Sequence, residues 1–419
     1  MTPPDWPALW RTFGKIGLLS FGGPAAQIAL MHRVLVDEER WLSEEDYLRA
    51  LSFCMLLPGP EAMQLATYAG WRLRGVPGGL LAGLLFVLPG AAVILALAAA
   101  YVSWGGLPLV AALFVGVKAC VAVIVVEALL RVAKRALKGP VARVFALLAF
   151  LGIFALGLPF PLIVLAAGLA GAILLTPANG KPTLPPARGH GHLAPTLMIG
   201  AALWGAPLLT LWAMGQSFLL TLGLFFSKLA LVTFGGAYAV LAYMTQTVVQ
   251  DHGWLGTAQM IDALGLAETT PGPLILVTEF VAYLAGHVQG GVGAALAAAM
   301  LTLWVTFLPC FLWIFAFAPY IERIAGRPRL QGALAGITAA VVGVIASLAL
   351  WFALHVLFAS VATLTLGPVH LTLPALRSLD PVAAGLMALS GYLLLIRHWP
   401  LLGVLGLSAV LGTATLLVG

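Results

Sequence analysis

The chain has 419 residues, of which 62% are hydrophobic and only 9% are charged, whereas soluble globular domains are about one quarter charged. This composition excludes an ordinary soluble domain. The net charge of +6 does not indicate a nucleic-acid partner, because the basic residues lie in short loops beside apolar stretches, where they set membrane orientation.

Apolar runs of 18 or more residues recur along the chain, which is typical of transmembrane helices. The sequence therefore predicts an all-α polytopic membrane protein. The expected apolar stretches are 12–31, 48–70, 78–103, 107–130, 143–157, 160–177 and 195–214 in the first half, and 217–248, 259–285, 290–318, 331–358, 381–396 and 399–417 in the second.

The first two stretches are interrupted by glycine and proline. Phe21-Gly22-Gly23 lies within the first, and Pro58-Gly59-Pro60 lies within the second. Proline ends the helical hydrogen-bond ladder, and unpaired backbone groups are tolerated in a membrane only beside protein or a water-filled cavity. A helix that starts after such a break directs its bare N–H groups toward mid-membrane, where they attract an anion. A kink that serves only helix packing is the alternative for any single break.

The second half repeats these features 213 positions later. Phe234-Gly235-Gly236 matches the first break, Pro271-Gly272-Pro273 matches the second, and Trp254 matches Trp41. After a short insertion the register resumes at 220, where Leu308-Pro309 matches Leu88-Pro89. We therefore expect two tandem repeats. The predicted boundaries are residues 1–177 for the first repeat, 178–194 for a linker loop, 195–214 for a connecting transmembrane helix and 215–419 for the second repeat.

The loop charges predict that the two repeats have inverted topology. The loop 131–143 is strongly basic and follows the fourth stretch, whereas the basic loop 323–329 follows the third stretch of the second half. Positive loops face the cytoplasm, so the charge bias changes sides between the halves. This predicts a cytoplasmic N-terminus and a periplasmic C-terminus. The first two stretches of each repeat either span the membrane as discontinuous helices or double back as re-entrant hairpins, and both alternatives remain open.

Inverted repeats with paired breaks are typical of secondary transporters, whose substrate site lies at the repeat interface. The candidate site therefore includes both FGG and both PGP breaks, with a polar lining drawn from Ser20, Gln27, Gln64, Thr67, Thr233, Thr269, Thr270 and Thr278. Charges inside apolar stretches are costly and are functional candidates. Lys15 and Lys228 could supply positive charge to a dianion, or extend from helix ends to water. The other charged candidates, for ion coupling or charge pairing, are Glu61, Lys118, Glu268 and Glu279; for Lys118 a structural salt bridge is the alternative.

Other chemistries find no support in the sequence. There is no P-loop, no HExxH and no recognisable nucleophile motif, so we expect a protein that is not an enzyme and uses no cofactor or metal. Cys54, Cys120 and Cys310 are isolated in apolar stretches and indicate no disulfide or zinc site. The linker's His190 and His192 are read as solvated residues, with metal binding as the alternative.

The stretch SFGGPAAQIALMHRVLVDEERWLSEEDYLRALSFCMLLPGP resembles the amino-terminal domain of the chromate ion transporter family. FGGAYAVLAYMTQTVVQDHGWLGTAQMIDALGLAETTPGP resembles that domain's second copy, so the chain is similar to the long, two-domain form. The chain departs from the family pattern at Gln27, where a histidine is usual, and at Cys54, where a glutamine is common.

The resemblance implies a multi-pass transporter of the bacterial inner membrane that exports chromate by alternating access and confers chromate resistance. A carrier of sulfate or another oxyanion is the alternative, and an anion channel is a third. The implied partners are the oxyanion and the lipid bilayer. The oligomeric state, including a homodimer, is left open.

Overall fold

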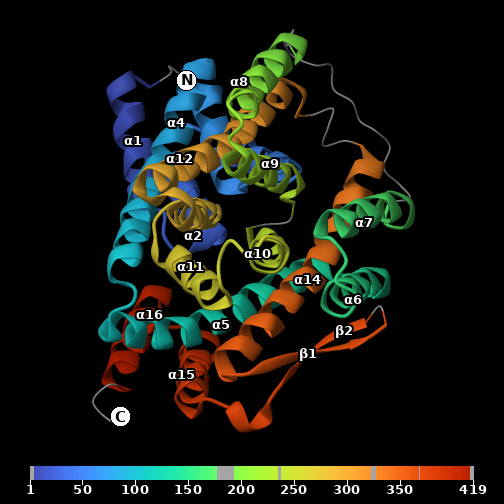
Figure 1. Cartoon of the computed structure of the whole chain (residues 1–419). Coiled ribbons are helices and arrows are strands. Elements are labelled where there is room, and N and C mark those ends of the chain that lie inside the picture. Colours follow the sequence, from blue (N-terminus) through green and yellow to red (C-terminus); the bar gives the residue numbers. More distant parts are fainter. Residues whose placement is uncertain (1–3, 177–192, 235–236, 322–326, 368, 416–419) are drawn as a thin grey trace. The chain divides into compact units, whose positions relative to one another are not determined.

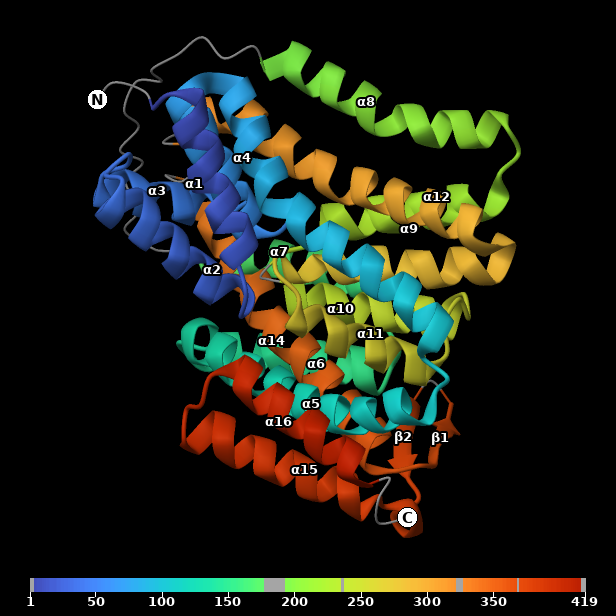
Figure 2. The ribbon, with the colours of Figure 1, turned by 90° about the vertical axis from the view of Figure 1, so that its left-hand side faces the viewer.

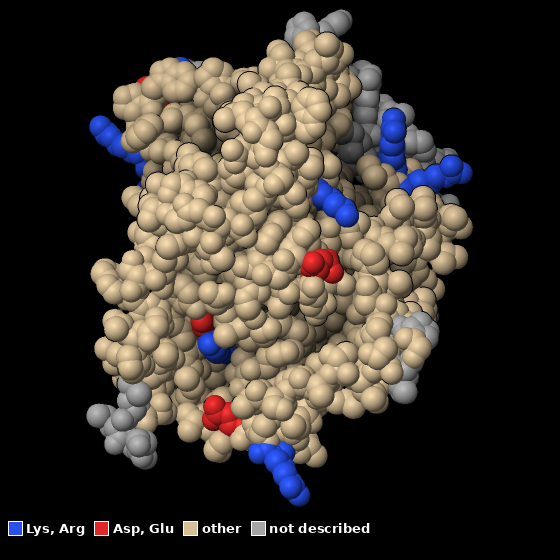
Figure 3. Space-filling view, viewed as in Figure 1, with Lys and Arg blue, Asp and Glu red and all other residues tan. Residues whose placement is uncertain are grey.

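The computed structural model describes residues 4–176, 193–234, 237–321, 327–367 and 369–415, and helices dominate it (Figure 1). Five segments are long and apolar enough to cross a membrane: Glu61–Trp104, Pro108–Ala136, Leu193–Ala213, Leu274–Tyr320 and Pro328–Leu357. The prediction of a helical polytopic membrane protein is confirmed. The face in Figure 3 carries few charged side chains, as expected of a surface in contact with lipid.

The chain divides into two compact units. Unit 1 comprises residues 1–99, 179–237 and 266–327, and unit 2 comprises residues 100–178, 238–265 and 328–419. The helices of unit 1 are α1 (Trp6–Leu19), α2 (Gly23–His32), the π-helical turn Arg33–Glu38, α3 (Glu44–Cys54), most of α4 (Glu61–Trp104), α8 (Leu193–Ala213), α9 (Ser217–Val232), the 3₁₀ turn Leu274–Leu276, α12 (Val277–Phe317) and the 3₁₀ turn Ala318–Tyr320.

The first two predicted stretches are broken at the expected residues. α1 ends at Leu19 and α2 begins at Gly23, while α3 ends at Cys54 and α4 begins at Glu61. Gly22 and Gly23 have φ values of +84° and +76°, in the left-handed region that glycine adopts without strain. The prediction of discontinuous helices at these breaks is confirmed.

Both broken stretches of the first copy double back on themselves. The Lys15 ammonium lies 3.1 Å from the Glu38 carboxylate, so α1 and the end of the α2 arm run side by side (Figure 2). The rings of Phe53 and Tyr68 lie 6.3 Å apart on either side of the second break. The 14 residues of α1 extend only about 21 Å, which is less than the hydrocarbon thickness of a bilayer.

Two of the long helices are hairpins rather than single rods. α4 has non-helical backbone at Arg74 and Gly75, and α12 has it at Gly290 and Gly291. In α4 the two arms pack closely: a side chain on Gly79 would lie 3.0 Å from the Thr67 carbonyl oxygen. Each PGP sequence therefore precedes a short helical arm that turns and continues as a longer helix.

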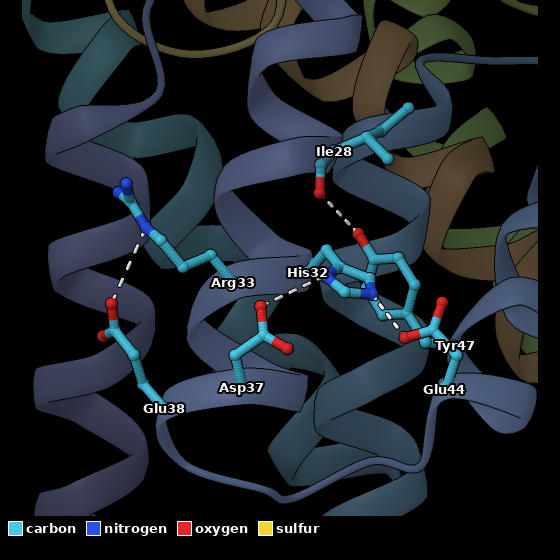
Figure 4. Close-up of polar contacts among 7 residues, drawn as sticks. All are labelled: Ile28, His32, Arg33, Asp37, Glu38, Glu44 and Tyr47. Carbon is cyan, nitrogen blue, oxygen red and sulfur yellow. Dashed lines mark hydrogen bonds and ion pairs between the residues drawn. The ribbon is translucent and has the colours of Figure 1, made fainter.

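A polar cluster closes the corner between α2 and α3 (Figure 4). The His32 ring lies between two carboxylates, with Nε2 2.6 Å from Glu44 and Nδ1 3.4 Å from Asp37. The Tyr47 hydroxyl donates to the Ile28 carbonyl at 2.6 Å. These contacts fix the return of the chain from the first break toward the second.

Unit 2 contains the end of α4 and a second group of elements. Its elements are α5 (Pro108–Ala136), α6 (Pro140–Phe154), α7 (Phe160–Leu174), α10 (Ala237–Thr245), the π-helical turn Gln246–Asp251, most of α11 (Thr257–Thr269), α14 (Pro328–Leu357), β1 (Val361–Leu366), β2 (Val369–Pro374), the 3₁₀ turn Leu376–Ser378, α15 (Pro381–Gly391), the π-helical turn Tyr392–Ile396 and α16 (Leu401–Ala414). The antiparallel hairpin of β1 and β2 was not predicted. Its alternating, β-branched residues Val361, Thr363 and Thr365 explain the strand.

The helices of unit 2 approach one another at small residues. α14 packs against α5, α6 and α7, and α16 packs against α5. A side chain on Gly343 would overlap the backbone of Ala146, and one on Gly171 would lie 2.8 Å from the Gly336 Cα. Small residues that let backbones approach are the usual contact in membrane helix bundles.

Local structure repeats at the offset seen in the sequence. The π-helical turn Arg33–Glu38 and the π-helical turn Gln246–Asp251 are 213 positions apart at both ends. Each is followed by a tryptophan, Trp41 and Trp254, whose N–H donates to the carbonyl of Leu35 and Val248 respectively. The two copies thus share details that composition alone does not produce. Their inverted orientation and the repeat boundaries stay predictions.

Candidate functional site

The breaks of the two copies are joined by a reciprocal pair of backbone hydrogen bonds in unit 1. The Gly59 N–H donates to the Thr233 carbonyl at 2.8 Å, and the Gly272 N–H donates to the Ser20 carbonyl at 2.9 Å. Ser20 corresponds to Thr233 in the repeat, and Gly59 corresponds to Gly272. Each PGP break therefore contacts the FGG break of the other copy.

We call the contact of Ser20, Gln27 and Gly272 the first junction, and the contact of Thr233, Gly59 and Gln64 the second junction. Each contains one buried glutamine. Gln27 Nε2 donates to the Gly272 carbonyl at 2.6 Å and to the Ser20 carbonyl at 3.2 Å. Gln64 Nε2 donates to the Pro58 carbonyl at 2.8 Å. Because carbonyl oxygens only accept, these bonds fix which end of each amide is nitrogen.

The other end of each amide is buried without a partner. Neither Gln27 Oε1 nor Gln64 Oε1 has a hydrogen-bond partner among the described residues, and the two side chains are 1% and 0% exposed. A buried acceptor without a donor costs about 1–3 kcal/mol, so each of these two oxygens suits a water or another hydrogen-bond donor and not an oxyanion, whose oxygens only accept. Both predicted glutamines thus belong to the junctions.

The glycines of both PGP breaks are required by their conformation and surroundings. Gly59 has φ +124° and Gly272 has φ +87°. A side chain on Gly59 would lie 2.8 Å from Cys310 Sγ, and one on Gly272 would lie 3.4 Å from the Gly90 Cα. Gly90 and Cys310 are themselves equivalent at the offset of 220, so the same packing occurs at both junctions.

Two helix N-termini meet at the first junction. α2 begins at Gly23 and is capped by Gly22, which offers no side-chain acceptor, and the 3₁₀ turn that precedes α12 begins at Leu274. Both starting points lie within three residues of the atoms joined by the Ser20–Gly272 bond. The first N–H groups of a helix have no internal partner and carry partial positive charge. The first junction therefore concentrates donors suited to an anion.

The second junction differs because a carboxylate stands at the start of its helix. Glu61 is the first residue of α4, and the first internal bond of this helix runs from the Gln64 N–H to the Pro60 carbonyl. The repeat position equivalent to Glu61 is Leu274, which is buried. At the second junction the acidic side chain is the first residue of the helix, whereas at the first junction the residue after Pro273 is apolar and the acidic side chain, Glu279, comes five residues later, in the first turn of α12.

The other predicted carboxylates and hydroxyls lie near the second PGP break. Glu268 is 5% exposed, and Glu279, in the first turn of α12, is 1% exposed. The hydroxyls of Thr269 and Thr270 donate to the carbonyls of Leu266 and Ala267 in their own helix. These two threonines therefore cap a helix end, and their hydroxyl protons are not directed toward a ligand.

The predicted cations are placed elsewhere. Lys15 is 52% exposed and pairs with Glu38, and Lys228 is exposed on α9. Lys118 lies in unit 2, where its ammonium is 2.9 Å from the Asp262 carboxylate. The structure thus places Lys118 in an ion pair, as the structural alternative expected, and none of the three belongs to a junction.

The remaining predicted residues are partly outside the described chain. Phe21, Gly22 and Gly23 are half-buried at the first break, whereas Gly59, Pro60 and the PGP sequence 271–273 are buried. Phe234 is half-buried, and Gly235, Gly236, His190 and His192 lie outside the described residues.

Sequence reasoning missed several polar residues. Asp262 accepts from the Tyr101 hydroxyl at 2.7 Å as well as pairing with Lys118. The rule that singled out other charges in apolar stretches also applies to Asp262, since it lies in the stretch 259–285. Thr302 and Thr306 are buried with unpartnered hydroxyls, and their spacing of four residues on one helix face was the available signal.

The fold and the junctions define a helical membrane protein with paired helix breaks, which is the architecture of a transporter. The family model described as "Chromate transporter" matches residues 7–172 and 220–413. The chain belongs to the chromate transporter family, whose members are transport proteins and not enzymes.

Curated relatives agree with this assignment. A protein named "Chromate transport protein" from Pseudomonas aeruginosa is 36% identical over 349 residues, which is 82% of this chain and 80% of the relative. A protein of the same name from Cupriavidus metallidurans is 33% identical, with 80% and 79% covered. A "Probable chromate transport protein" from Synechococcus elongatus is 32% identical, with 81% and 82% covered. No solved structure matches the chain.

Proposed function

We propose that this protein carries chromate outward across the bacterial inner membrane, and that the oxyanion binds at the first junction. Family membership supports the substrate class. The observation that carries the proposed site is the bond between Gly272 and Ser20, because it brings the N-termini of two broken helices together in unit 1. A tetrahedral dianion accepts hydrogen bonds on every face and suits such a cluster of donors.

Alternating access follows from the way in which the junctions are built. Each reciprocal hydrogen bond joins one copy to the other, so a movement of the copies against each other would break and re-form these bonds together. Each bond contributes only about 0.5–1.5 kcal/mol net, which thermal motion and substrate binding can overcome. In this mechanism the junctions are both the substrate site and the contact that rearranges.

The proposed direction follows from charge. An inside-negative potential drives a dianion outward by about 4.6 kcal/mol per 100 mV, since each charge contributes about 2.3 kcal/mol. The distribution of basic loops supports a cytoplasmic N-terminus and a periplasmic C-terminus. The membrane potential alone can therefore power export.

Chromate flux into everted membrane vesicles tests the proposed site. We expect Gly272→Ala to reduce chromate transport at least tenfold, because alanine is strained at φ +87° and meets Leu276 at 3.0 Å. Gly205→Ala is the matched control, since nothing lies within 4 Å of a side chain at that helical glycine. Gly59→Ala tests the second junction. If the Gly272 and Gly59 variants fold and transport chromate at the wild-type rate, the site lies elsewhere.

Two further measurements separate the alternatives. Sulfate that competes with radiolabelled chromate at equal concentration would indicate a general carrier of tetrahedral oxyanions. Flux that saturates and is stimulated by unlabelled chromate on the opposite side indicates a carrier. Flux that does neither would indicate an anion channel and would contradict alternating access.

A further inference from the structure

A buried carboxylate without a partner lies close to the first junction. Glu279 is six residues beyond Pro273, in the first turn of α12, and its side chain is 1% exposed. Its Oε2 atom has no hydrogen-bond partner, and no ion pair joins Glu279 to any described residue. A buried, ionised carboxylate is destabilising by several kcal/mol unless a counter-charge or a proton neutralises it.

Two hydroxyl groups on the second arm of α12 are also buried without a hydrogen-bond partner. Thr302 and Thr306 are fully buried, and neither Oγ1 atom has a partner among the described residues. Other buried threonines in unit 1 bond to the backbone of their own segment, as Thr278 does with the Ile275 carbonyl at 2.8 Å. Threonines four residues apart lie on the same face of a helix. The two unpartnered hydroxyl groups therefore lie on the same face of the second arm of α12.

The hairpin brings the Glu279 carboxylate to the depth of Thr302, and Thr306 lies about one helical turn further along the same arm. The arms of α12 turn at Gly290 and Gly291, and a side chain on Gly286 would lie 2.6 Å from the Ala294 carbonyl oxygen and 2.8 Å from the Ala295 Cα. Gly286 therefore lies level with residues 294 and 295. Both arms rise by the same distance per residue, so seven residues away from the turn Glu279 lies level with residues 301 and 302.

The charged side chains on the neighbouring described segments form no ion pair with Glu279. Lys228 on α9 is exposed, and α8, which also packs against α12, has no charged residue. The other titratable side chains on α12 and its neighbouring segments in unit 1 are Tyr283, His287 and Cys310 on α12, Tyr320 in the following turn, Lys228 on α9, Glu61, Tyr68, Arg72 and Arg74 on α4, and Glu268 on α11.

We propose that Glu279, Thr302 and Thr306 form a binding site for a monovalent cation, H⁺ or Na⁺, which crosses the membrane together with the oxyanion. The inference rests on the proposed function, because the oxyanion supplies the coupling. A bound dianion repels the nearby carboxylate, so it binds more tightly when a cation neutralises Glu279, and the cation binds more tightly when the dianion is present. Carboxylate and hydroxyl oxygens accept either a proton or sodium.

Cotransport has a measurable consequence for driving force. One cation reduces the net charge moved per chromate from two to one, so export still follows the membrane potential but with half the voltage dependence. A cation gradient then becomes a second determinant of how far chromate accumulates.

The test uses the purified full-length chain in liposomes, with the potential held at zero by potassium and valinomycin. A tenfold gradient of H⁺ is imposed in one arm and of Na⁺ in the other, and the equilibrium distribution of radiolabelled chromate is measured. We expect the arm with the coupled cation to change the distribution about tenfold, and the other arm to leave it unchanged. Glu279→Gln should abolish the response while chromate exchange without a gradient persists. Glu45→Gln, at a carboxylate that is 81% exposed, should respond like the wild type.

These outcomes separate the two proposals. Wild-type protein that exchanges chromate but ignores both gradients would overturn the cation site and leave the proposed function intact. Absence of any chromate flux would overturn both. An undiminished response in Glu279→Gln would also overturn the site, since chromate protonation is the same for every variant. If that variant does not fold, Thr302→Val and Thr306→Val keep the carboxylate. They should raise the cation concentration for half-maximal transport severalfold, and an unchanged value would refute their role.

Discussion

The two buried glutamines offer a matched test of the crossed junctions. Gln27→Met and Gln64→Met each replace a fully buried amide by an apolar side chain of similar length, and each removes one unpartnered Oε1 atom. The desolvation and packing changes are therefore similar for the two variants. What differs is the number of hydrogen bonds lost: two from Gln27 and one from Gln64.

The structure sets the size and sign of this difference. Gln27 Nε2 serves two carbonyls, one of them on Gly272 of the other copy, whereas Gln64 Nε2 serves only the Pro58 carbonyl of its own copy. The additional hydrogen bond, to the Ser20 carbonyl, is worth about 1 kcal/mol net, because this carbonyl keeps the Gly272 N–H as a donor. We expect Gln27→Met to be less stable than Gln64→Met by about 1 kcal/mol.

Thermal unfolding in detergent measures the effect. A thiol-reactive fluorophore can follow unfolding, because Cys54, Cys120 and Cys310 are all buried and react only when the protein unfolds. A difference of about 1 kcal/mol corresponds to roughly 2 °C in Tm for a large domain. If Gln64→Met melts at the same temperature as Gln27→Met or below it, the contact from Gln27 to Gly272 does not hold the copies together.

Further predictions concern other parts of the chain. Asp262→Asn should destabilise the protein by about 3 kcal/mol, because it leaves the half-buried Lys118 unpaired, and adding Lys118→Met should recover part of the loss in the same melting assay. Lys15→Ala should change stability by less than about 1 kcal/mol and leave chromate flux unaltered, since its ion pair is exposed; a large loss of flux would return this lysine to the site. Gly343→Ala should destabilise by about 1–3 kcal/mol because its side chain overlaps the Ala146 backbone, whereas Gly205→Ala should be neutral or slightly stabilising in circular-dichroism melts.

The helix breaks were predictable from sequence because their causes are local. Proline cannot donate to the helical ladder and glycine adopts positive φ, so α4 begins directly after Pro60 and a new helical turn begins directly after Pro273. The repeat was equally visible, since rare residues such as Trp41 and Trp254 recur at one offset.

The partners of each break were not predictable, because they depend on tertiary contacts. Nothing local to Gly59 indicates that its N–H donates to Thr233, and nothing local to Gln27 indicates that it reaches Gly272. The same limit applies to charges. The sequence around a lysine in an apolar stretch does not show whether the side chain faces water, as Lys15 does, or pairs with an acid far along the chain, as Lys118 does with Asp262.

The position of bound chromate in a crystal would show whether the oxyanion binds at the first junction. Chromium scatters anomalously, so crystals of the protein grown with chromate would mark the ion by an anomalous difference peak. We expect a peak at the first junction, with oxyanion oxygens within hydrogen-bonding reach of backbone N–H groups at the starts of α2 and α12. A peak among the helices of unit 2, away from Gly272 and Gln27, would contradict this prediction.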